Sequence, residues 1–402
     1  RLVGSEMCIR DRYKRMALGV AVSFALQGCS LFSSEEDLNP MAPLPKVESA
    51  FTADTAWSSS VGDGIGDFYS QLKPVVEEDR IYAAARDGDV TAFERESGKE
   101  LWSVDLADLP INADKRSARL SGGLVSRYGK LFLGSENGVV YALNEANGEV
   151  LWQTTVPGEV VASPAVEDGR VVVLTTSGRL VALDTDEGKL QWTLSEEQPP
   201  LTLRSAGAPI ITNGAVIYGR ADGKVGIALL SNGQPVRQSK VADPRGATEL
   251  DRMVDVDASP LIAGDELYAI AYNGQLMARK LMSGDEVWKR KYSGYRDMAV
   301  TGNAIVLTDS RSHLFAVDRR NGLELWSNTQ LENRTVTAPV ILGDYVVVGD
   351  VEGYLYWLDR TDGTIKAMQQ LDSSGLYAAP LVEGDTLYVQ SRDGKLYALK
   401  RP

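Results

Sequence analysis

The chain has 402 residues, a formal net charge of −13 and 44% apolar residues, which is ample for a hydrophobic core. An acidic chain without clusters of Lys and Arg does not match the phosphate backbone of nucleic acids. Its two cysteines, Cys8 and Cys29, lie near the N-terminus, and His313 is its single histidine. This composition excludes thiolate metal sites and disulfides in the body of the chain, and any site that needs two imidazoles.

The first 28 residues predict two segments outside the folded body. Residues 1–12, RLVGSEMCIRDR, fit neither a basic leader nor an apolar run. We interpret them as a non-native, artefactual extension, with a disordered native extension as the alternative. Residues 13–28 combine a basic start, a short apolar run and small residues at the end, which is typical of a secretory signal peptide. The apolar run is too short to span a bilayer.

Leu26-Gln-Gly-Cys29 resembles the lipobox of bacterial lipoproteins, in which the signal is cleaved before a cysteine that is then acylated. The resemblance implies lipidation of Cys29, and several acyl chains make a stable anchor. An ordinary signal peptide with an incidental cysteine is the alternative. In that lipoprotein pattern, Ser30 implies transport to the outer membrane, on its periplasmic face. Residues 29–50 are acidic and Pro-rich, and they predict a flexible tether between lipid and body.

From residue 51 to residue 402 the chain forms one repetitive domain. In the copy from Pro164, an apolar run, a Gly turn, two alternating runs around a second Gly and a third Gly lead to Trp192, 28 residues later. Other copies start at 74, 123, 209, 260, 298, 339 and 380, and those from 209 and 339 lack the Trp. The period of about 40 residues predicts an all-β fold, an eight-bladed β-propeller of four-stranded antiparallel blades.

The copy from Pro164 predicts four strands. They lie around Ser163–Val166, at Arg170–Thr175, at Arg179–Asp184 and at Leu190–Leu194, with Gly in each tight turn. We interpret the recurrent Trp as packing between blades, with stacking on a cofactor as the alternative.

Fragments at the two ends of the body complement each other. The stretch Phe51–Val61 contains Trp57 and looks like the end of a repeat, whereas the copy from Pro380 stops before its Trp segment. We predict that the N-terminal strand completes the last blade and closes the ring, because closure removes exposed strand edges.

The connectors between copies differ in length. Most have 10 to 13 residues, but those from Trp102 to Gly123, Trp192 to Pro209 and Arg237 to Pro260 are longer. The last two flank the fourth copy and emerge on the same face of a propeller. Insertions concentrated on one face usually mark the binding face.

The two connectors beside the fourth copy contain candidate binding residues. Leu201 and Leu203 are apolar in a polar connector and precede Arg204, and Asp255 and Asp257 alternate with valines. Apolar anchors with a charged rim indicate a protein-binding patch. A leucine packed under its own loop and a calcium site at the aspartates are alternatives. The D-x-[DN]-x-[DN]-G calcium pattern is missing, and we expect no metal and no cofactor.

Motifs of known enzymes are missing from the sequence, which has no G-x-S-x-G and no Walker A motif. His313 lies on a turn between two predicted strands, so we expect it at the surface. We predict that the protein is not an enzyme.

The repeat has the form GxLYALDxxTGxxxW, as in Val140–Gly148 and Leu396–Lys400, and it resembles the repeat of pyrroloquinoline-quinone-type propellers. That resemblance implies the architecture. Oxidoreductases of that family have adjacent cysteines near the cofactor and carboxylate-rich calcium ligands, whereas this body has no cysteine. The repeat alone supports the alternative function, a periplasmic quinone-dependent oxidoreductase-like propeller, and the missing cysteines argue against it. A polysaccharide-binding propeller is a third, but the tyrosines mostly occupy strand positions.

Residues 29–402 resemble the family of BamB, a propeller lipoprotein of the outer-membrane β-barrel assembly (BAM) machinery. The resemblance is carried by CSLFSSEED (29–37), TAW (55–57), DR (251–252), DVD (255–257) and VGDVEGY (348–354). It implies a non-catalytic scaffold that binds the POTRA domains of BamA and assists folding and insertion of outer-membrane proteins. Direct contact with unfolded client proteins stays open. The family's docking residues lie in an L-x-L-R and a D-x-D segment, which match Leu201, Leu203 and Arg204, and Asp255 and Asp257.

Overall fold

A computed structural model describes residues 39–68, 70, 72–113, 116–204 and 207–401. The expectations for the extension, the signal peptide, the lipidation of Cys29 and the first part of the tether lie outside the described residues. One compact unit comprises Met41–Pro402, and the description below concerns that unit. None of the described helices has the length and apolar character needed to cross a bilayer.

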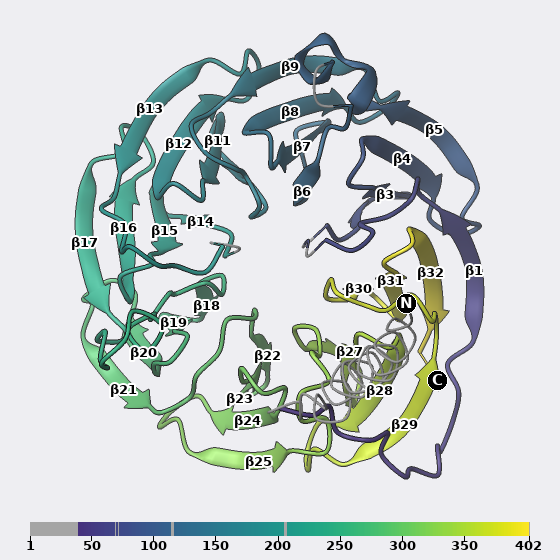
Figure 1. Cartoon of the computed structure of the whole chain (residues 1–402), viewed down its shortest axis with the longest axis vertical. Helices are drawn as coiled ribbons and strands as arrows, with labels where there is room; N and C mark the ends of the chain where they lie inside the picture. Colours follow the sequence, from purple (N-terminus) through teal and green to yellow (C-terminus); the bar gives the residue numbers. More distant parts are fainter. Residues whose placement is uncertain (1–38, 69, 71, 114–115, 205–206, 402) are drawn as a thin grey trace, which may run out of the picture. The chain divides into compact units, whose positions relative to one another are not determined.

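Eight antiparallel four-stranded sheets, here numbered as blades 1 to 8 in chain order, surround a common axis (Figure 1). The all-β, eight-bladed prediction is therefore confirmed. From the innermost to the outermost strand, blade 1 consists of β2 (Val75–Glu77), β3 (Arg80–Ala84), β4 (Asp89–Glu94) and β5 (Glu100–Asp105), blade 2 of β6 (Leu120–Arg127), β7 (Lys130–Ser135), β8 (Val139–Asn144) and β9 (Val150–Thr155), and blade 3 of β10 (Ala165–Glu167), β11 (Arg170–Leu174), β12 (Arg179–Asp184) and β13 (Leu190–Ser195). In the same order, blade 4 consists of β14 (Ile210–Thr212), β15 (Ala215–Gly219), β16 (Lys224–Leu229) and β17 (Pro235–Lys240), blade 5 of β18 (Leu261–Ala263), β19 (Glu266–Ile270), β20 (Leu276–Lys280) and β21 (Glu286–Arg290), and blade 6 of β22 (Ala299–Thr301), β23 (Ala304–Thr308), β24 (Leu314–Asp318) and β25 (Glu324–Asn328). Blade 7 consists of β26 (Val340–Leu342), β27 (Tyr345–Gly349), β28 (Tyr354–Asp359) and β29 (Ile365–Gln370), and blade 8 of β30 (Leu381–Glu383), β31 (Thr386–Gln390), β32 (Lys395–Lys400) and β1 (Thr55–Ser60).

The strands predicted for the copy from Pro164 agree with β10 to β13 to within two residues. The turn between β10 and β11 shows why the repeat needs Gly at this point: Asp168 and Gly169 have φ angles of 48° and 71°. Few side chains tolerate this left-handed region, and Gly adopts it without steric cost.

Ring closure follows the prediction from the two end fragments. β1 pairs antiparallel with β32, for example through Ser58 opposite Tyr397, and so becomes the outer strand of blade 8. The sheet order β1-β32-β31-β30 places the first and the last described strand in one blade.

Each recurrent Trp packs against the next blade, as predicted. The Trp192 indole donates its Nε1–H to the carbonyl of Leu230, at 2.8 Å. A Cβ atom added to Gly233 would lie 2.5 Å from the same ring, so only Gly fits under it. The same pairing joins six blade seams, with Trp57 over Gly98, Trp102 over Gly148, Trp152 over Gly188, Trp192 over Gly233, Trp288 over Gly322 and Trp326 over Gly363.

Two seams without a Trp are filled in other ways. In blade 4 the guanidinium of Arg237 lies over Gly284 and donates to the carbonyl of Met282, at 3.2 Å. In blade 7 the ring of Phe51 packs on Tyr345 and Trp357, with centroids 5.1 and 5.7 Å apart. The N-terminal segment therefore takes the place of the missing Trp in blade 7.

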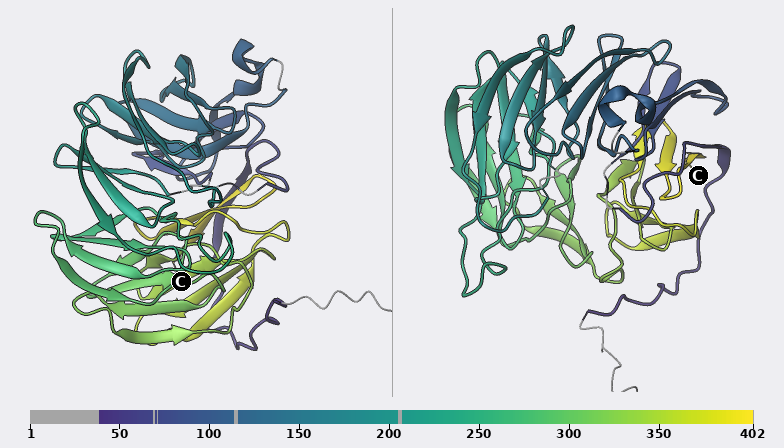
Figure 2. Two further views of the ribbon diagram at one scale, coloured as in Figure 1. Left: turned by 60° about the vertical axis from the view of Figure 1, so that its left-hand side comes forward. Right: turned by 45° about the horizontal axis from the view of Figure 1, so that its top comes forward.

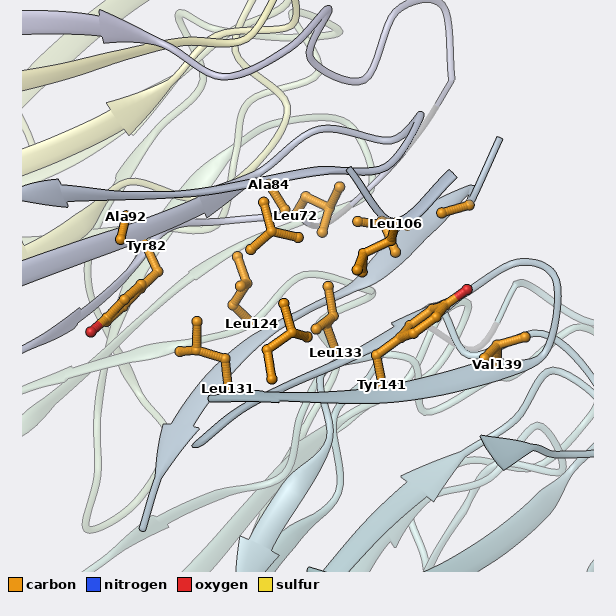
Figure 3. Close-up of a cluster of buried hydrophobic side chains, with 14 of the residues drawn as sticks. Leu72, Tyr82, Ala84, Ala92, Leu106, Leu124, Leu131, Leu133, Val139 and Tyr141 are labelled. Carbon is orange, nitrogen blue, oxygen red and sulfur yellow. The ribbon is translucent and has the colours of Figure 1, made fainter. Parts of the chain in front are cut away.

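The core consists of apolar layers between neighbouring blades. Figure 3 shows the layer between blades 1 and 2, where Leu131 and Leu133 of β7 meet Tyr82 and Ala84 of β3. All four side chains are fully buried. Burial of these faces on both sides of each sheet explains why β3 and β7 are nearly continuous apolar runs.

The segment before β1 lies against the rim of blade 7, beside β29, as the purple trace in Figure 1 shows. Ala50 N–H donates to the carbonyl of Lys366, and Ala42 N–H donates to the carbonyl of Glu332, both at 2.9 Å. The side chain of Val47 packs on the apolar core of blades 6 and 7. Residues 42, 47 and 50, which lie in the segment expected as a tether, thus contact the propeller.

His313 is buried, contrary to the expectation of a surface position. Only 5% of the residue is exposed, its Nδ1 lies 3.0 Å from Oδ2 of Asp309, and its ring packs edge-on against Phe315. The expectation was wrong because the turn is covered by the following connector, where Asn333 N–H donates to the carbonyl of Arg311.

Candidate functional site

The turns between the second and third strands and the connectors between blades lie together on one face, which we call the connector face. Backbone hydrogen bonds tie each connector to these turns. Val160 N–H donates to Ser135 O at 2.9 Å, and Val256 N–H donates to Arg220 O at 3.0 Å. The long connectors from Trp192 to Pro209 and from Arg237 to Pro260 therefore flank blade 4 on this face.

The long connector between blades 1 and 2 packs inward. It contains two short 3-10 helices, η1 (Leu106–Asp108) and η2 (Pro110–Asn112), visible as dark blue coils in Figure 2. Buried Asn112 donates to the Leu106 carbonyl and the Tyr141 hydroxyl, both at 2.8 Å. This connector completes the core at the seam of blades 1 and 2.

The connector between blades 3 and 4 presents the L-x-L-R residues. Leu201 is 39% exposed, and Leu203 is half-buried. The N–H of Leu203 donates to Oδ1 of Asp255 at 2.8 Å, so the two long connectors are directly joined. Leu201 is therefore an exposed apolar side chain on a loop whose backbone is fixed by a buried carboxylate.

Arg204 follows on the same loop, and its guanidinium faces blade 2. Its Nε and Nη2 donate to Oε2 of Glu159, both at 3.1 Å, and Nη2 lies 3.1 Å from Oε1 of Glu136. The arginine side chain is 40% exposed. Among the described residues its carboxylate partners are these glutamates, rather than Asp255 and Asp257.

Asp255 and Asp257 are both buried, with 2% and 7% of each residue exposed. Val254 and Val256, which alternate with the two aspartates, enter the core of blades 4 and 5, and the other side of the segment is covered by the loop that contains Leu203. Burial raises the pKa of Asp255 from 3.8 to about 6, although backbone hydrogen bonds oppose the shift. Oδ2 of Asp255 has no hydrogen-bond partner among the described residues.

A buried charge cluster supports the start of the blade 3–4 connector. The guanidinium of Arg220, whose side chain is 7% exposed, lies 2.6 Å from Oε2 of Glu196 and 2.9 Å from Oδ2 of Asp222. The Tyr218 hydroxyl donates to Oε1 of Glu196 at 2.5 Å. Burial and this carboxylate raise the pKa of Tyr218, so the hydroxyl keeps its proton and acts as a donor.

The connector between blades 4 and 5 has a self-bonded tip. Thr248 and Asp251 exchange hydrogen bonds between side chains and backbone N–H groups, both at 3.1 Å, and Arg252 Nε donates to the carbonyl of Gly246. Leu250 on this tip is 67% exposed. Sequence reasoning missed Leu250, although its position in a connector already singled out could have indicated it.

Sequence reasoning also missed Glu136 and Glu159. Neither residue stands out in its repeat, since acidic residues are common in the turns.

In the part of the chain that the structure describes, no group of three or more His, Cys, Asp or Glu residues could hold a metal ion. The arrangement offers exposed apolar groups beside a fixed guanidinium, which is the chemistry of protein recognition.

Comparison with known proteins gives a consistent picture. The profile of a family described as outer membrane protein assembly factor BamB matches residues 49–113, 86–328 and 329–401. The BamB of Vibrio cholerae is 46% identical over 334 residues, covering 83% of this chain and 84% of that protein. The BamB of Yersinia pestis is 42% identical over 329 residues, with 82% and 84% covered.

Solved structures show the same fold. The crystal structure of BamB from Moraxella catarrhalis superposes with a TM-score of 0.78 at 24% identity, covering 87% of this chain and all of that one. A quinohemoprotein alcohol dehydrogenase from Pseudomonas putida HK5 reaches a TM-score of 0.69 at 13% identity, over 89% of this chain and 78% of that one. At such low identities the likeness concerns the fold alone.

Proposed function

The chain belongs to the family of the outer membrane protein assembly factor BamB, and on that premise we propose that it is a non-catalytic scaffold of the BAM complex that binds the POTRA region of BamA. Through that contact it would assist the folding and insertion of outer-membrane proteins. We further propose that acylated Cys29 anchors it in the outer membrane, facing the periplasm.

The proposal rests on the loop between blades 3 and 4, which exposes an apolar and a cationic side chain. Its Leu201 is 39% exposed, and the backbone of Leu203 is held by a buried carboxylate at 2.8 Å. The guanidinium of Arg204 is oriented by two glutamates at 3.1 Å. A preorganised apolar and cationic loop loses little conformational entropy on binding, which favours affinity.

The experiment is a binding titration of the full chain against detergent-solubilised BamA. We expect the double change Leu201→Ala and Leu203→Ala to weaken binding about 1,000-fold, because truncation of each anchor that becomes buried in an interface costs about 2 kcal/mol or more and about 1.4 kcal/mol is tenfold. The matched control is Leu323→Ala with Leu325→Ala, two rim leucines of blade 6 that are 57% and 54% exposed. Equal effects of the two double variants would contradict the assignment of the loop.

The alternative of a quinone-dependent oxidoreductase rests on the fold only. The dehydrogenase likeness is at 13% identity, and the body of the chain contains no cysteine. The exposed groups of the connector face favour a binding role.

A second prediction concerns the role of Asp255. We expect Asp255→Asn to keep affinity for BamA within about twofold, since the Asn oxygen also accepts the Leu203 N–H, whereas Asp255→Ala loses about tenfold. If Asn weakened binding as much as Ala does, the negative charge itself would meet the partner.

The free energy of unfolding of the free protein should depend on pH through Asp255. Below pH 3.8 Asp255 is protonated whether folded or unfolded, but between 3.8 and about 6 the folded state alone retains the proton. This contribution to the free energy of unfolding is therefore present at low pH and disappears as the pH rises through about 6. It amounts to roughly 3 kcal/mol at most. Urea unfolding at pH 4 and pH 7.5 should show this loss for wild type and not for Asp255→Asn.

A further inference from the structure

The side chain of Glu136 lies where two arginines from different parts of the chain meet. Glu136 belongs to the turn between β7 and β8 in blade 2, and its side chain is 6% exposed. Its Oε1 lies 3.1 Å from Nη2 of Arg204, and its Oε2 pairs with Nη2 of Arg86. Its backbone N–H donates to the carbonyl of Arg119 at 2.9 Å, which fixes the turn itself.

These contacts form a row of alternating charges across the connector face. Arg86 comes from blade 1, Glu136 from blade 2, Glu159 from the connector between blades 2 and 3, and Arg204 from the next connector. Arg86 is also held in place by the ring of Phe68, with its guanidinium carbon 3.6 Å from the ring centroid. Arg204 lies between Glu136 and Glu159 in this row, and its Nη1 atom takes no part in the contacts with the two glutamates.

We propose that Glu136 is a positioning residue for partner binding: it fixes the guanidinium of Arg204 from blade 2 and does not itself meet the partner. The inference rests on the proposed function, because it assumes that the loop of Leu201, Leu203 and Arg204 is the contact. The long side chain of a solvent-facing arginine otherwise samples many rotamers, and ordering it costs affinity. The nearly buried Glu136 carboxylate, itself held by Arg86, removes most of that cost before the partner arrives.

The test is a double-mutant cycle of Glu136→Gln and Arg204→Ala, read as affinity for solubilised BamA. Gln keeps the shape of the side chain and removes the charge. We expect Glu136→Gln alone to weaken binding about tenfold and to add nothing in the Arg204→Ala background, because residues that act as one unit are non-additive. If the two losses simply add, or if Glu136→Gln leaves affinity unchanged, the positioning role is wrong.

A matched control is Glu167→Gln. Glu167 pairs with Arg127 at 2.9 Å, again between blades 2 and 3. This pair lies at the turns between the first and second strands, on the face opposite to the connector face. We expect this variant to bind as wild type does, and an equal loss in both variants would contradict the inference. Glu159→Gln is the second variant, since its side chain is 40% exposed and its replacement does not endanger folding. It should show a smaller loss that also vanishes with Arg204→Ala.

A second readout does not depend on the partner. In the free chain, Glu136→Gln should speed hydrogen exchange at the backbone amides of Leu203 and Arg204, with unchanged exchange in β12 and β16. Unchanged loop exchange would overturn the inference even if BamA binding proved to lie elsewhere. If instead the leucine double variant bound BamA normally while loop exchange responded to Glu136→Gln, the assignment of this loop as the BamA contact would fail and the Glu136–Arg204 contact would stand.

Discussion

Arg334→Met is expected to lower the free energy of unfolding by about 3–5 kcal/mol, because it leaves the buried carboxylate of Asp350 without its cation. Arg334 is 1% exposed and Asp350 is fully buried, with Nε of Arg334 donating to Oδ2 of Asp350 at 2.7 Å. Nη1 of Arg334 also donates to the carbonyl of Ala42 at 2.8 Å, so the substitution also removes one of the contacts that hold the N-terminal segment. Urea unfolding at pH 7.5 measures the change.

The control is Arg360→Met on the opposite side of blade 7. Arg360 pairs at 3.3 Å with Asp344, whose side chain is 90% exposed, and such surface pairs contribute about 1 kcal/mol or less. If the two variants lost the same stability, the Arg334 cluster would not stabilise the fold as argued. Limited proteolysis before residue 50 should increase for Arg334→Met alone, since only that variant loses a hydrogen bond to Ala42.

The second large effect is expected at the seam between blades 3 and 4. Trp192→Ala should lower the free energy of unfolding by about 3–5 kcal/mol, since it removes a buried aromatic ring and leaves a cavity over Gly233. It also deletes the 2.8 Å hydrogen bond to the Leu230 carbonyl. The measurement is again urea unfolding, with the midpoint compared at constant slope.

The neighbouring seam provides the comparison. Arg237 occupies the Trp position over Gly284, but it is half-buried and its hydrogen bond to Met282 is 3.2 Å long. We expect Arg237→Ala to cost about 1 kcal/mol, in the range of one exposed hydrogen bond. A loss for Arg237→Ala as large as for Trp192→Ala would mean that the seams do not owe their stability to the buried ring.

The fold could be predicted because its rules are local and repeated. Gly at positive φ, as at Gly169, and the alternation of β12 act within a few residues, and eight copies report the same pattern. Closure by β1 could also be predicted, because a strand missing at one end of the chain and present at the other has one pairing that leaves no open edge.

The candidate site was predicted in part. The positions of Leu201 and Arg204 followed from connector length and from the family resemblance, and the structure places both residues on the connector face. Burial of Asp255 could not be foreseen, because it depends on the loop that contains Leu203, from another connector. His313 shows the same effect on a turn that looks exposed in sequence.

By itself, the sequence determined the strands, the turns, the number of blades and the closure of the ring, since each depends on neighbours along the chain or on counting copies. Only the tertiary structure decided which charges meet. The pairing of Glu136 with Arg204, and of Arg334 with the Ala42 carbonyl, joins separate blades and connectors at about 3 Å. Such contacts depend on the distance and angle between whole blades, a property that no local pattern of residues contains.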